Sequence, residues 1–312
     1  MFEASRVIRS VAAVIAVALA TLSAAPVGAQ APDDSGYVEV EGARLYYESY
    51  GDLDAAGETP LLILHGGFMS SGEIAEFAQA FGATRPVILL DQRAHGRSTG
   101  LDVPLTYERL GDDGAALVEA LGLERVDVIG YSMGGGMAIQ MAIRHPERVR
   151  KLVMLSATYR RDGWYDEVLE AMASLTAEFM ASTPMGSEYR RLSPTPDRFD
   201  DYFDLVLTLN RDDQEIPDDV VRAIDAPTMV IVGDADGVTL EHAIRMFELH
   251  GGRDRQAAAT GVLTEVPPAR LLILPATSHL GLMGQVGEIV QHVNDFLDDA
   301  RPRLPAAYGG QD

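Results

Sequence analysis

The segment 130–136 reads GYSMGGG and contains the residue with the clearest capacity for chemistry, Ser132. It directly follows an apolar run, Val126 to Ile129, and directly precedes a helix-length segment that begins near Met133. A sharp strand-to-helix turn of this kind holds a serine in a strained conformation, and the residues two before and two after it must be small. The turn also places the hydroxyl at the positive end of a helix, where a developing oxyanion is stabilised. The pattern predicts a nucleophilic serine; the competing interpretation is a tight glycine turn with a packing serine.

Two further loops carry motifs that agree with a nucleophilic Ser132. Segment 65–68 reads HGGF after one expected strand, and segment 91–98 reads DQRAHGRS after the next. With these three motifs, the sequence from about residue 37 to residue 300 resembles the α/β-hydrolase fold superfamily, and in particular its esterase- and lipase-like serine hydrolases with a helical lid. The resemblance implies that 65–68 is the oxyanion loop. The family usually has glycine where Ala94 stands, a departure that does not touch the expected chemistry.

A serine hydroxyl needs a base poised near neutral pH, and imidazole is the side chain with that property. Of the seven histidines, His279 follows the last expected strand, at the carboxyl edge of the sheet where a catalytic base must lie. The alternative is a loop histidine solvated at the surface. His65 and His95 lie in the two loop motifs, and we expect them to hold those loops by hydrogen bonds. We expect His242, His250 and His292 on exposed helix faces, and His145 at a helix end.

The triad acid must lie between the serine and the histidine in the chain order that this fold uses, just beyond a strand end. Segment 232–237, VGDADG, meets both conditions and offers two carboxylates, Asp234 and Asp236. The resembling families carry the acid at the second Asp of this pattern, which implies Asp236. Asp234 would then bind backbone amides and shape the turn, and the choice between the two stays open here.

These groups define a hydrolytic mechanism. His279 takes the proton from Ser132, which attacks an acyl carbonyl, while the acid fixes the imidazole tautomer. Backbone N–H groups of Met133 and Gly67, or of Phe68 in place of Gly67, stabilise the tetrahedral oxyanion. Water activated by the same imidazole then releases the acid. This chemistry requires no cofactor, and the Asp-rich stretches lack a histidine at ligand spacing, so no metal is expected.

The elements that must position these groups alternate between strand and helix. A starting hairpin is expected at 37–41 and 44–50, and the later apolar runs lack alternation, which is typical of parallel strands buried on both faces. These runs are 61–64, 87–90, 126–129, 152–155, 229–232 and 271–274. Helix-length segments lie at 72–81, 107–121, 133–144, 240–249 and 286–297. The order predicts a doubly wound α/β sheet, and the resemblance implies eight mostly parallel strands.

The interval 159–224, about 66 residues long, breaks this alternation after the sixth strand. Its patterns predict helices at 165–180 and 198–209, with breaks at 183–184 and 193–196. We interpret it as a helical lid over the carboxyl edge of the sheet, between core segments 37–158 and 225–300. Trp164 and Tyr165, together with Phe68, are candidate substrate-binding residues; alternatively, the apolar lid side chains pack the lid helices onto each other.

Composition and the N-terminus restrict the remaining possibilities. The 47 acidic and 25 basic residues give a formal charge of -22, which repels nucleic acids and anionic lipid surfaces, and the absence of Cys excludes thiolate chemistry. Residues 1–29 have the basic, apolar and small-residue regions of a cleaved signal peptide, so we expect a secreted or periplasmic protein. The alternative, an uncleaved anchor, is short for a bilayer span. Residues 31–36 and 301–312 are expected to be a flexible leader and tail.

The interpretation is therefore an exported serine hydrolase acting on carboxylic esters or related small acyl substrates. A serine at this turn argues against haloalkane dehalogenases and epoxide hydrolases of the superfamily, which use aspartate there. Lactone hydrolysis, carbon–carbon bond hydrolysis and perhydrolysis use the same triad and stay open. A ligand-binding member of the fold with negligible turnover is the alternative from another class, and oligomeric state is not predicted.

Overall fold

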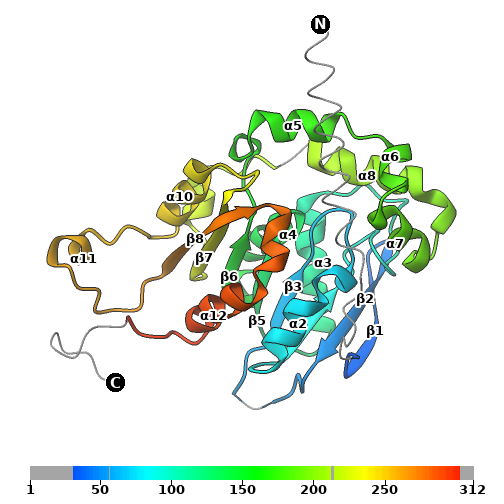
Figure 1. Cartoon of the computed structure of the whole chain (residues 1–312). Coiled ribbons are helices and arrows are strands. Elements are labelled where there is room, and N and C mark those ends of the chain that lie inside the picture. The colour runs from blue at the N-terminus through cyan, green and yellow to red at the C-terminus, as the bar shows by residue number, and fades with distance from the viewer. Residues whose placement is uncertain (1–30, 56, 212–213, 303–312) are drawn as a thin grey trace, which may run out of the picture.

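The computed structural model describes residues 31–55, 57–211 and 214–302 (Figure 1). Eight strands form one sheet in the order β1-β2-β4-β3-β5-β6-β7-β8. β1 pairs antiparallel with β2, β2 pairs antiparallel with β4, and the other neighbours are parallel. The strands are β1 Asp34–Val40, β2 Ala43–Tyr50, β3 Leu61–Leu64, β4 Val87–Leu90, β5 Val126–Tyr131, β6 Val149–Leu155, β7 Thr228–Ala235 and β8 Ala269–Ser278. The predicted eight-stranded, mostly parallel sheet is confirmed.

The structure describes only part of the segments predicted at the two termini. The predicted signal peptide at 1–29, and all but the first two residues of the tail predicted at 301–312, lie outside the described residues. The expectation of a flexible leader at 31–36 is wrong from Asp34 onward, because Asp34, Ser35 and Gly36 pair with β2. Tyr47 explains part of this pairing: its ring atoms would lie about 3.1 Å from a Cβ at Gly36, so a residue without a side chain fits there.

The central strands are buried on both faces, as their unbroken apolar runs predict. All four residues of β3 and all four of β4 are buried. Successive residues point into different cores: Leu62 and Leu64 pack on the side of α3 and α4, whereas Leu61 and Ile63 pack on the side of α2 and α12. Figure 1 shows α2 and α12 together in front of the sheet.

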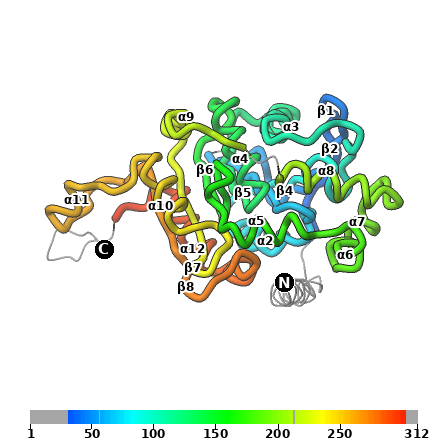
Figure 2. The backbone as a smooth tube through the Cα atoms, turned by 90° about the horizontal axis from the view of Figure 1, so that it is seen from above, coloured from blue at the N-terminus to red at the C-terminus, as the bar shows by residue number. Residues whose placement is uncertain are grey.

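The helices of the core match the predicted segments closely. They are α2 Ala75–Gly82, preceded by a 3-10 turn Ser71–Ile74, then α3 Tyr107–Ala120, α4 Met133–Arg144, α10 Leu240–Leu249 and α12 Val286–Leu297. Two short helices, α9 Asp218–Arg222 and α11 Arg255–Thr260, were not predicted. α11 and the loops beside it extend away from the rest of the molecule (Figures 1 and 2). No helix in the described part of the chain is long and apolar enough to cross a membrane.

The predicted exposure of two histidines on and after α10 is wrong. His242 is 5% exposed and His250 is 9% exposed. His242 lies on the same helix face as Ala243, Met246 and Leu249, so the periodicity that buries those residues buries it as well. Its ring stacks on Tyr159 with centroids 4.5 Å apart.

The segment after β6 is a helical insertion, as predicted, and lies along the upper edge of the sheet in Figure 1. Its helices are α5 Asp166–Ala173, α6 Ala177–Ala181, α7 Pro184–Leu192 and α8 Phe199–Arg211. The single helix expected at 165–180 is therefore wrong, because the side chain of Thr176 caps a new helix by accepting from Phe179 N–H. The break expected at 183–184 instead begins α7, since Thr183 is its N-cap and Pro184 its first residue.

Both ends of the insertion meet at its base. Arg160 forms an antiparallel bridge with Glu215, and Ile216 N–H donates to the carbonyl of Tyr159 at 3.1 Å. A second bridge joins Trp164 to Val238, in the loop after β7. The insertion is thus attached beside the strand ends that carry the candidate site.

Candidate active site

Ser132 occupies the turn between β5 and α4 in a conformation that L residues rarely adopt, with φ 53° and ψ −118°. A Cβ at Gly130 would lie 2.3 Å from the carbonyl oxygen of Gly134, and a Cβ at Gly134 would lie 2.3 Å from that of Leu64. The small residues two before and two after the serine are therefore a steric requirement, as expected. The turn exposes the hydroxyl at the first turn of α4, above the carboxyl edge of the sheet.

The structure brings three of the predicted residues together. Ser132 Oγ lies 3.1 Å from Nε2 of His279, and Nδ1 of His279 lies 3.0 Å from Oδ1 of Asp236. The carboxylate is fully buried, whereas the imidazole keeps 26% of its side chain exposed. Burial raises the pKa of Asp236, but hydrogen bonds and charge at His279, with donors at Ser156 and Val238, outweigh it and leave the pKa below its ordinary value. The carboxylate is thus charged near neutral pH, beside the ring that must become imidazolium.

The two carboxylates of the 232–237 segment have different partners. Asp236 contacts His279, while Asp234 is exposed and accepts from the backbone N–H of Thr277 at 3.2 Å. Asp234 therefore ties the loop after β7 to β8, whose end carries His279. The alternative that Asp234 is the acid has no contact in its favour within the described residues.

The oxyanion loop lies opposite the start of α4. A Cβ at Gly67 would lie 3.7 Å from Sδ of Met133, and Phe68 has φ 61°, so the loop turns sharply at this point. The backbone N–H of Met133 is at the first helical position, where no carbonyl within the helix can accept it. Within the described residues, no acceptor takes a hydrogen bond from the backbone N–H of Gly67 or Phe68. These amides are available to an oxyanion bound between the loop and the helix.

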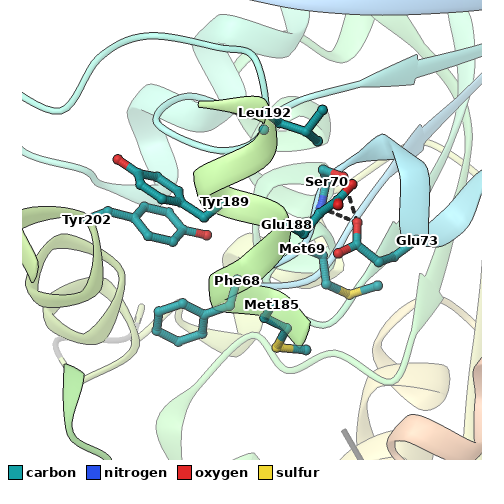
Figure 3. Close-up of a pocket in the computed structure, with 10 residues that line it drawn as sticks. Phe68, Met69, Ser70, Glu73, Met185, Glu188, Tyr189, Leu192 and Tyr202 are labelled. Atoms are coloured by element: carbon teal, nitrogen blue, oxygen red, sulfur yellow. Dashed lines mark hydrogen bonds between the residues drawn. The ribbon is translucent and has the colours of Figure 1, made fainter. Parts of the chain in front are cut away.

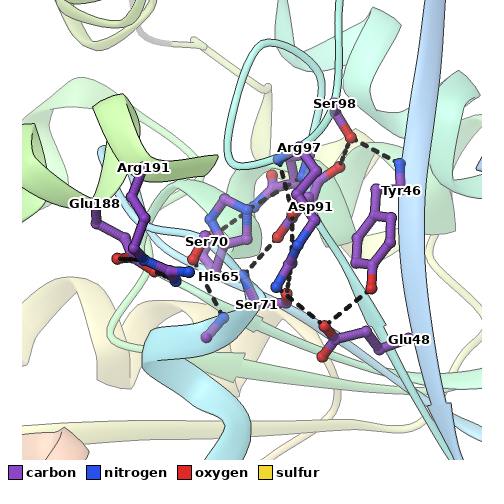
Figure 4. Close-up of polar contacts among 12 residues, drawn as sticks. Tyr46, Glu48, His65, Ser70, Ser71, Asp91, Arg97, Ser98, Glu188 and Arg191 are labelled. Atoms are coloured by element: carbon purple, nitrogen blue, oxygen red, sulfur yellow. Dashed lines mark hydrogen bonds and ion pairs between the residues drawn. The ribbon is translucent and has the colours of Figure 1, made fainter. Parts of the chain in front are cut away.

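A buried carboxylate at the end of β4 fixes the loops beside the oxyanion loop (Figure 4). Asp91 accepts from the backbone N–H of Ser71 at 2.7 Å and from that of Arg97 at 2.9 Å. The guanidinium of Arg97 then pairs with Asp91 at 3.0 Å and with Glu48 of β2 at 3.2 Å. A Cβ at Gly96 would lie 2.3 Å from the Asp91 carboxylate, so the loop closes tightly around this group. The network rigidly connects β2, β4 and the segment after the oxyanion loop.

His65 and His95 hold these loops, as expected. Nδ1 of His65 donates to the carbonyl of Gly66 at 2.8 Å, and its Nε2 accepts from the backbone N–H of Gln92 at 3.1 Å. Nδ1 of His95 donates to the carbonyl of Arg93 at 2.9 Å. Burial lowers the pKa of both rings, to about 3 for His95, so both are neutral at working pH.

The departure at Ala94 has a structural meaning. Ala94 has φ 67°, in the left-handed region where glycine is favoured, which explains why the resembling family has glycine there. Its N–H donates to the carbonyl of Thr99 at 3.0 Å, so the turn forms despite the side chain. The chain retains the loop and accepts the strain.

The predicted substrate-binding residues fall into three environments. The ring of Trp164 lies edge-to-face on His279, with centroids 5.5 Å apart, so it borders the triad. Phe68 packs between Tyr202 and Phe203 of α8, at centroid distances of 5.7 and 5.8 Å, and thereby joins the oxyanion loop to the lid. Tyr165 is 44% exposed, and no ring contact or hydrogen bond joins its side chain to the triad in the described structure.

A small cavity lies behind Phe68, between the oxyanion loop and α7 (Figure 3). It encloses about 10 Å³, which is room for about one water molecule and not for an acyl chain. Glu73 lies at its wall, where it accepts from Ser70 N–H at 2.8 Å and from Ser70 Oγ–H at 2.6 Å. Burial raises the pKa of Glu73. The cavity therefore belongs to the packing between lid and core.

Three residues at the site were missed from the sequence. Ser156, directly after β6, lies 2.6 Å from both Asp236 and His279. Val206 and Asn210 of α8 face the oxyanion loop, at 3.6 and 3.7 Å from the Cβ position of Gly67. The available signal for Ser156 was its place at the carboxyl end of a predicted strand; the lid residues gave none, because helical periodicity does not show what a lid helix covers.

The arrangement can activate a hydroxyl, hold an oxyanion and supply a proton, which are the requirements of acyl transfer. Within residues 31–55, 57–211 and 214–302, no group of three or more His, Asp or Glu side chains is placed to hold a metal ion.

Comparisons with known proteins give relatives of several activities. A protein named as a carbamate hydrolase, from Caulobacter sp. strain K31, is 38% identical over 120 residues, which are 38% of this chain and 44% of the relative. The enol-lactonase of Burkholderia xenovorans LB400 superposes with a TM-score of 0.63 at 21% identity, covering 84% of this chain and 100% of that one. A meta-cleavage product hydrolase of Pseudomonas fluorescens IP01 gives 0.67 at 19% identity, covering 85% and 98%. The chain thus matches less than half the length of the first curated relatives, and the structural likenesses show the fold alone.

The family comparison covers more of the chain. The model described as the alpha/beta hydrolase fold matches residues 59–250, from before β3 to the end of α10, which is more than half of the sequence. This range includes the serine turn, the oxyanion loop, the insertion and the loop with Asp236. The chain therefore belongs to the α/β hydrolase fold family.

Proposed function

We propose that the protein is an exported serine hydrolase that cleaves small carboxylic esters or related acyl compounds through an acyl-enzyme intermediate. The observation that carries the proposal is the unbroken line of hydrogen bonds from Ser132 Oγ through His279 to Asp236, at 3.1 and 3.0 Å. A packing serine in a glycine turn would need neither the base nor the buried carboxylate behind it.

The chemistry follows from these contacts. Nε2 of His279 accepts the proton of Ser132 as Oγ attacks the acyl carbon, and the charged Asp236 stabilises the imidazolium that forms. The backbone N–H groups of Met133 and Gly67 stabilise the oxyanion; losing one such donor typically costs about 3 kcal/mol in the transition state. His279 then returns the proton to the leaving alcohol, and the same ring activates water to release the acid.

The surroundings of the oxyanion loop support a neutral acyl substrate. The three atoms nearest to the Cβ position of Gly67 belong to the uncharged side chains of Met133, Val206 and Asn210. Carbamates and lactones, the substrates that the names of two relatives indicate, are also acyl compounds attacked at a carbonyl carbon. Esters, lactones and amides therefore form the panel on which the protein should be screened.

Two measurements on Ser132→Ala test the proposal. We expect the folded variant to lose hydrolysis of short p-nitrophenyl esters by about 10⁴-fold or more, and to resist labelling by a fluorophosphonate probe. Ser182→Ala, which removes an exposed lid hydroxyl, is the matched control and should behave like the unmodified protein. Undiminished turnover in Ser132→Ala, or an unmodified protein that is folded but inert to the probe, would overturn the assignment in favour of a binding protein.

Export is part of the same proposal and is supported by the sequence of residues 1–29, with Arg6 and Arg9 before an apolar stretch and a small-residue site at 27–29. We expect the mature protein in the periplasm or medium to begin near residue 30. Mass spectrometry of the N-terminal peptide from fractionated cells gives the answer; an intact Met1 on the cell-associated protein would contradict cleavage.

A further inference from the structure

Ser156 directly follows β6 and lies between the serine turn and the acid loop. It is 1% exposed and has φ 51°, a backbone conformation that favours glycine. Its N–H donates to the carbonyl of Ile231 in β7 at 2.8 Å, while the carbonyl of Leu155 accepts from Ser132 N–H at 3.0 Å. Backbone hydrogen bonds therefore tie this position to β7 and to the serine turn after β5.

The hydroxyl of Ser156 completes a closed ring of three hydrogen bonds with the base and the acid. Its Oγ lies 2.6 Å from Oδ2 of Asp236 and 2.6 Å from Nδ1 of His279, while Nδ1 lies 3.0 Å from Oδ1 of Asp236. Two of the three distances involve the hydroxyl, and both are shorter than the direct contact between base and acid.

Counting protons in this ring fixes the tautomer of the base. A charged Asp236 can only accept, so the single proton of the Ser156 hydroxyl is donated to Oδ2. The Oγ lone pairs then face Nδ1 of His279, which must carry a proton because both of its neighbours are acceptors. Nε2 is left unprotonated and free to accept from Ser132. With the opposite tautomer, the lone pair at Nδ1 would face a carboxylate oxygen.

We propose that Ser156 is a positioning residue for the hydrolytic reaction: its hydroxyl holds the Nδ1–H tautomer of His279 and its orientation toward Ser132, and shares the imidazolium charge with Asp236. This inference rests on the proposed function. The Ser156 hydroxyl is not needed merely as a hydrogen-bond donor to the carboxylate, because Asp236 also accepts from Val238 N–H at 3.1 Å and from Gly233 N–H at 3.4 Å. The contact to His279 adds a second acceptor at Nδ1, beside Oδ1 of Asp236.

Two aromatic side chains, Tyr131 and Trp164, also lie against the His279 ring. Tyr131 donates from its hydroxyl to the backbone carbonyl of His279 at 3.1 Å, and its ring lies 5.2 Å from the imidazole. Burial raises the pKa of Tyr131, so the phenol stays neutral. Trp164 covers another side of the ring. Among the described residues in contact with the imidazole, Asp236 alone brings a charge, and the Ser156 hydroxyl modulates that pair.

The test uses Ser156→Ala and Ser156→Gly in the full chain. Both remove the hydroxyl, but glycine also relieves the backbone strain at φ 51° and should unfold at the same or a higher temperature than alanine. We expect kcat for a p-nitrophenyl ester to fall roughly 10- to 100-fold in both variants, as for loss of a hydrogen bond to a charged group, with KM within about a factor of two. The acid limb of kcat/KM should move to lower pH in both variants, because the imidazolium loses an acceptor.

The possible outcomes separate this inference from the proposed function. If the unmodified protein neither turns over esters nor labels with a fluorophosphonate, the proposed function fails. If it labels and both Ser156 variants react at its rate, the positioning role alone is wrong. A slow alanine variant with a normal glycine variant would assign the loss to backbone strain, and slow variants with an unmoved acid limb would assign it to packing; either result overturns the proposal.

Discussion

The contact between α4 and the residue after Ser156 offers a sharp test of how the serine turn is held. Gly135 lies in the first turn of α4, and a Cβ at that position would come 2.2 Å from the Cβ of Ala157. Non-bonded carbons pack at about 3.5–4.0 Å. Both atoms are fixed to the backbone, so no rotamer change can separate them. Gly135→Ala must therefore push α4 away from the end of β6.

The magnitude follows from two opposing terms. Alanine in place of glycine within a helix stabilises by about 1 kcal/mol, whereas overpacking a core typically costs about 1–3 kcal/mol. A contact this short between rigid atoms belongs at the upper end of that range, so we expect Gly135→Ala to lower the free energy of unfolding by about 1–2 kcal/mol. The displacement should also separate Ser132 from His279 and reduce kcat/KM by about tenfold or more.

A second substitution can restore the space. Ala157 is 4% exposed, and Ala157→Gly alone should cost about 1–2 kcal/mol through the lost methyl and the greater freedom of the unfolded chain. In the double variant Gly135→Ala/Ala157→Gly, the clash disappears because one methyl group again fills the space, now attached to residue 135. We expect the double variant to be more stable than the sum of the two single effects by about 1–3 kcal/mol, with kcat/KM largely recovered.

Urea unfolding of the four proteins, together with their ester hydrolysis, measures this coupling. The slope of unfolding free energy against urea should stay constant, so that midpoints can be compared directly. Additive effects within about 0.5 kcal/mol would refute the reasoning, because they would mean that the two positions do not share the space. Recovery of stability without recovery of kcat/KM would refute the connection between this contact and the placement of Ser132.

Three further predictions concern charge. Asp236→Asn should lower kcat by about 10⁴-fold by favouring the wrong imidazole tautomer, while Asp234→Asn should change kcat far less. Equal losses in ester assays would contradict this prediction, and a larger loss in Asp234→Asn would reverse the assignment of the acid. Burial lowers the pKa of His250 from 6.5 to about 4, so between these pH values the folded state binds fewer protons than the unfolded state. Acidification therefore lowers the free energy of unfolding, by about 2 kcal/mol at pH 5. Urea unfolding at pH 7.5 and 5 should show that His250→Gln removes this loss of stability, whereas exposed His292→Gln does not. If the free energy of unfolding changed equally with pH in both variants, the prediction would be contradicted. Burial raises the pKa of Glu73, so its ionisation opposes folding as pH rises. Glu73→Gln should therefore raise the melting temperature at pH 8, and raise it less at pH 5. An equal rise at both pH values would contradict a destabilising charge on Glu73.

The core was predictable because its strands are buried on both faces. Runs such as Leu61–Leu64 and Val87–Leu90 have no polar position to confuse with a helix face, and the structure begins and ends them at the same residues. The insertion was harder to divide. Its helices are short, and Thr176 and Pro184 can each end one helix or begin another, so local sequence does not decide between them.

The candidate site was predictable wherever chemistry and position coincide. Ser132 and His279 follow strand ends in loops with strong local constraints, and geometry brings them together. Ser156 also follows a strand end, but a single serine has no motif, and its contacts depend on where β7 and β8 place Asp236 and His279. The burial of His242 follows from the periodicity of α10, but its stacking on Tyr159 could not be predicted, because that residue lies at the base of the insertion, far away in the sequence.

Backbone strain in this protein is concentrated at the site. Among the described non-glycine residues with positive φ, four lie in turns that follow strands at the carboxyl edge of the sheet: Phe68, Ala94, Ser132 and Ser156. Such conformations cost about 1–3 kcal/mol each, and they persist only where surrounding contacts over-determine them. Three of these residues have backbone N–H groups tied to a neighbouring strand or loop: Ser132 to Leu155, Ser156 to Ile231 and Ala94 to Thr99. Glycine would relieve the strain at Ser132 and Ser156, but only by removing the hydroxyls that face His279. The chain keeps side chains where the backbone favours glycine, and the two strained serines are those whose hydroxyls contact the base.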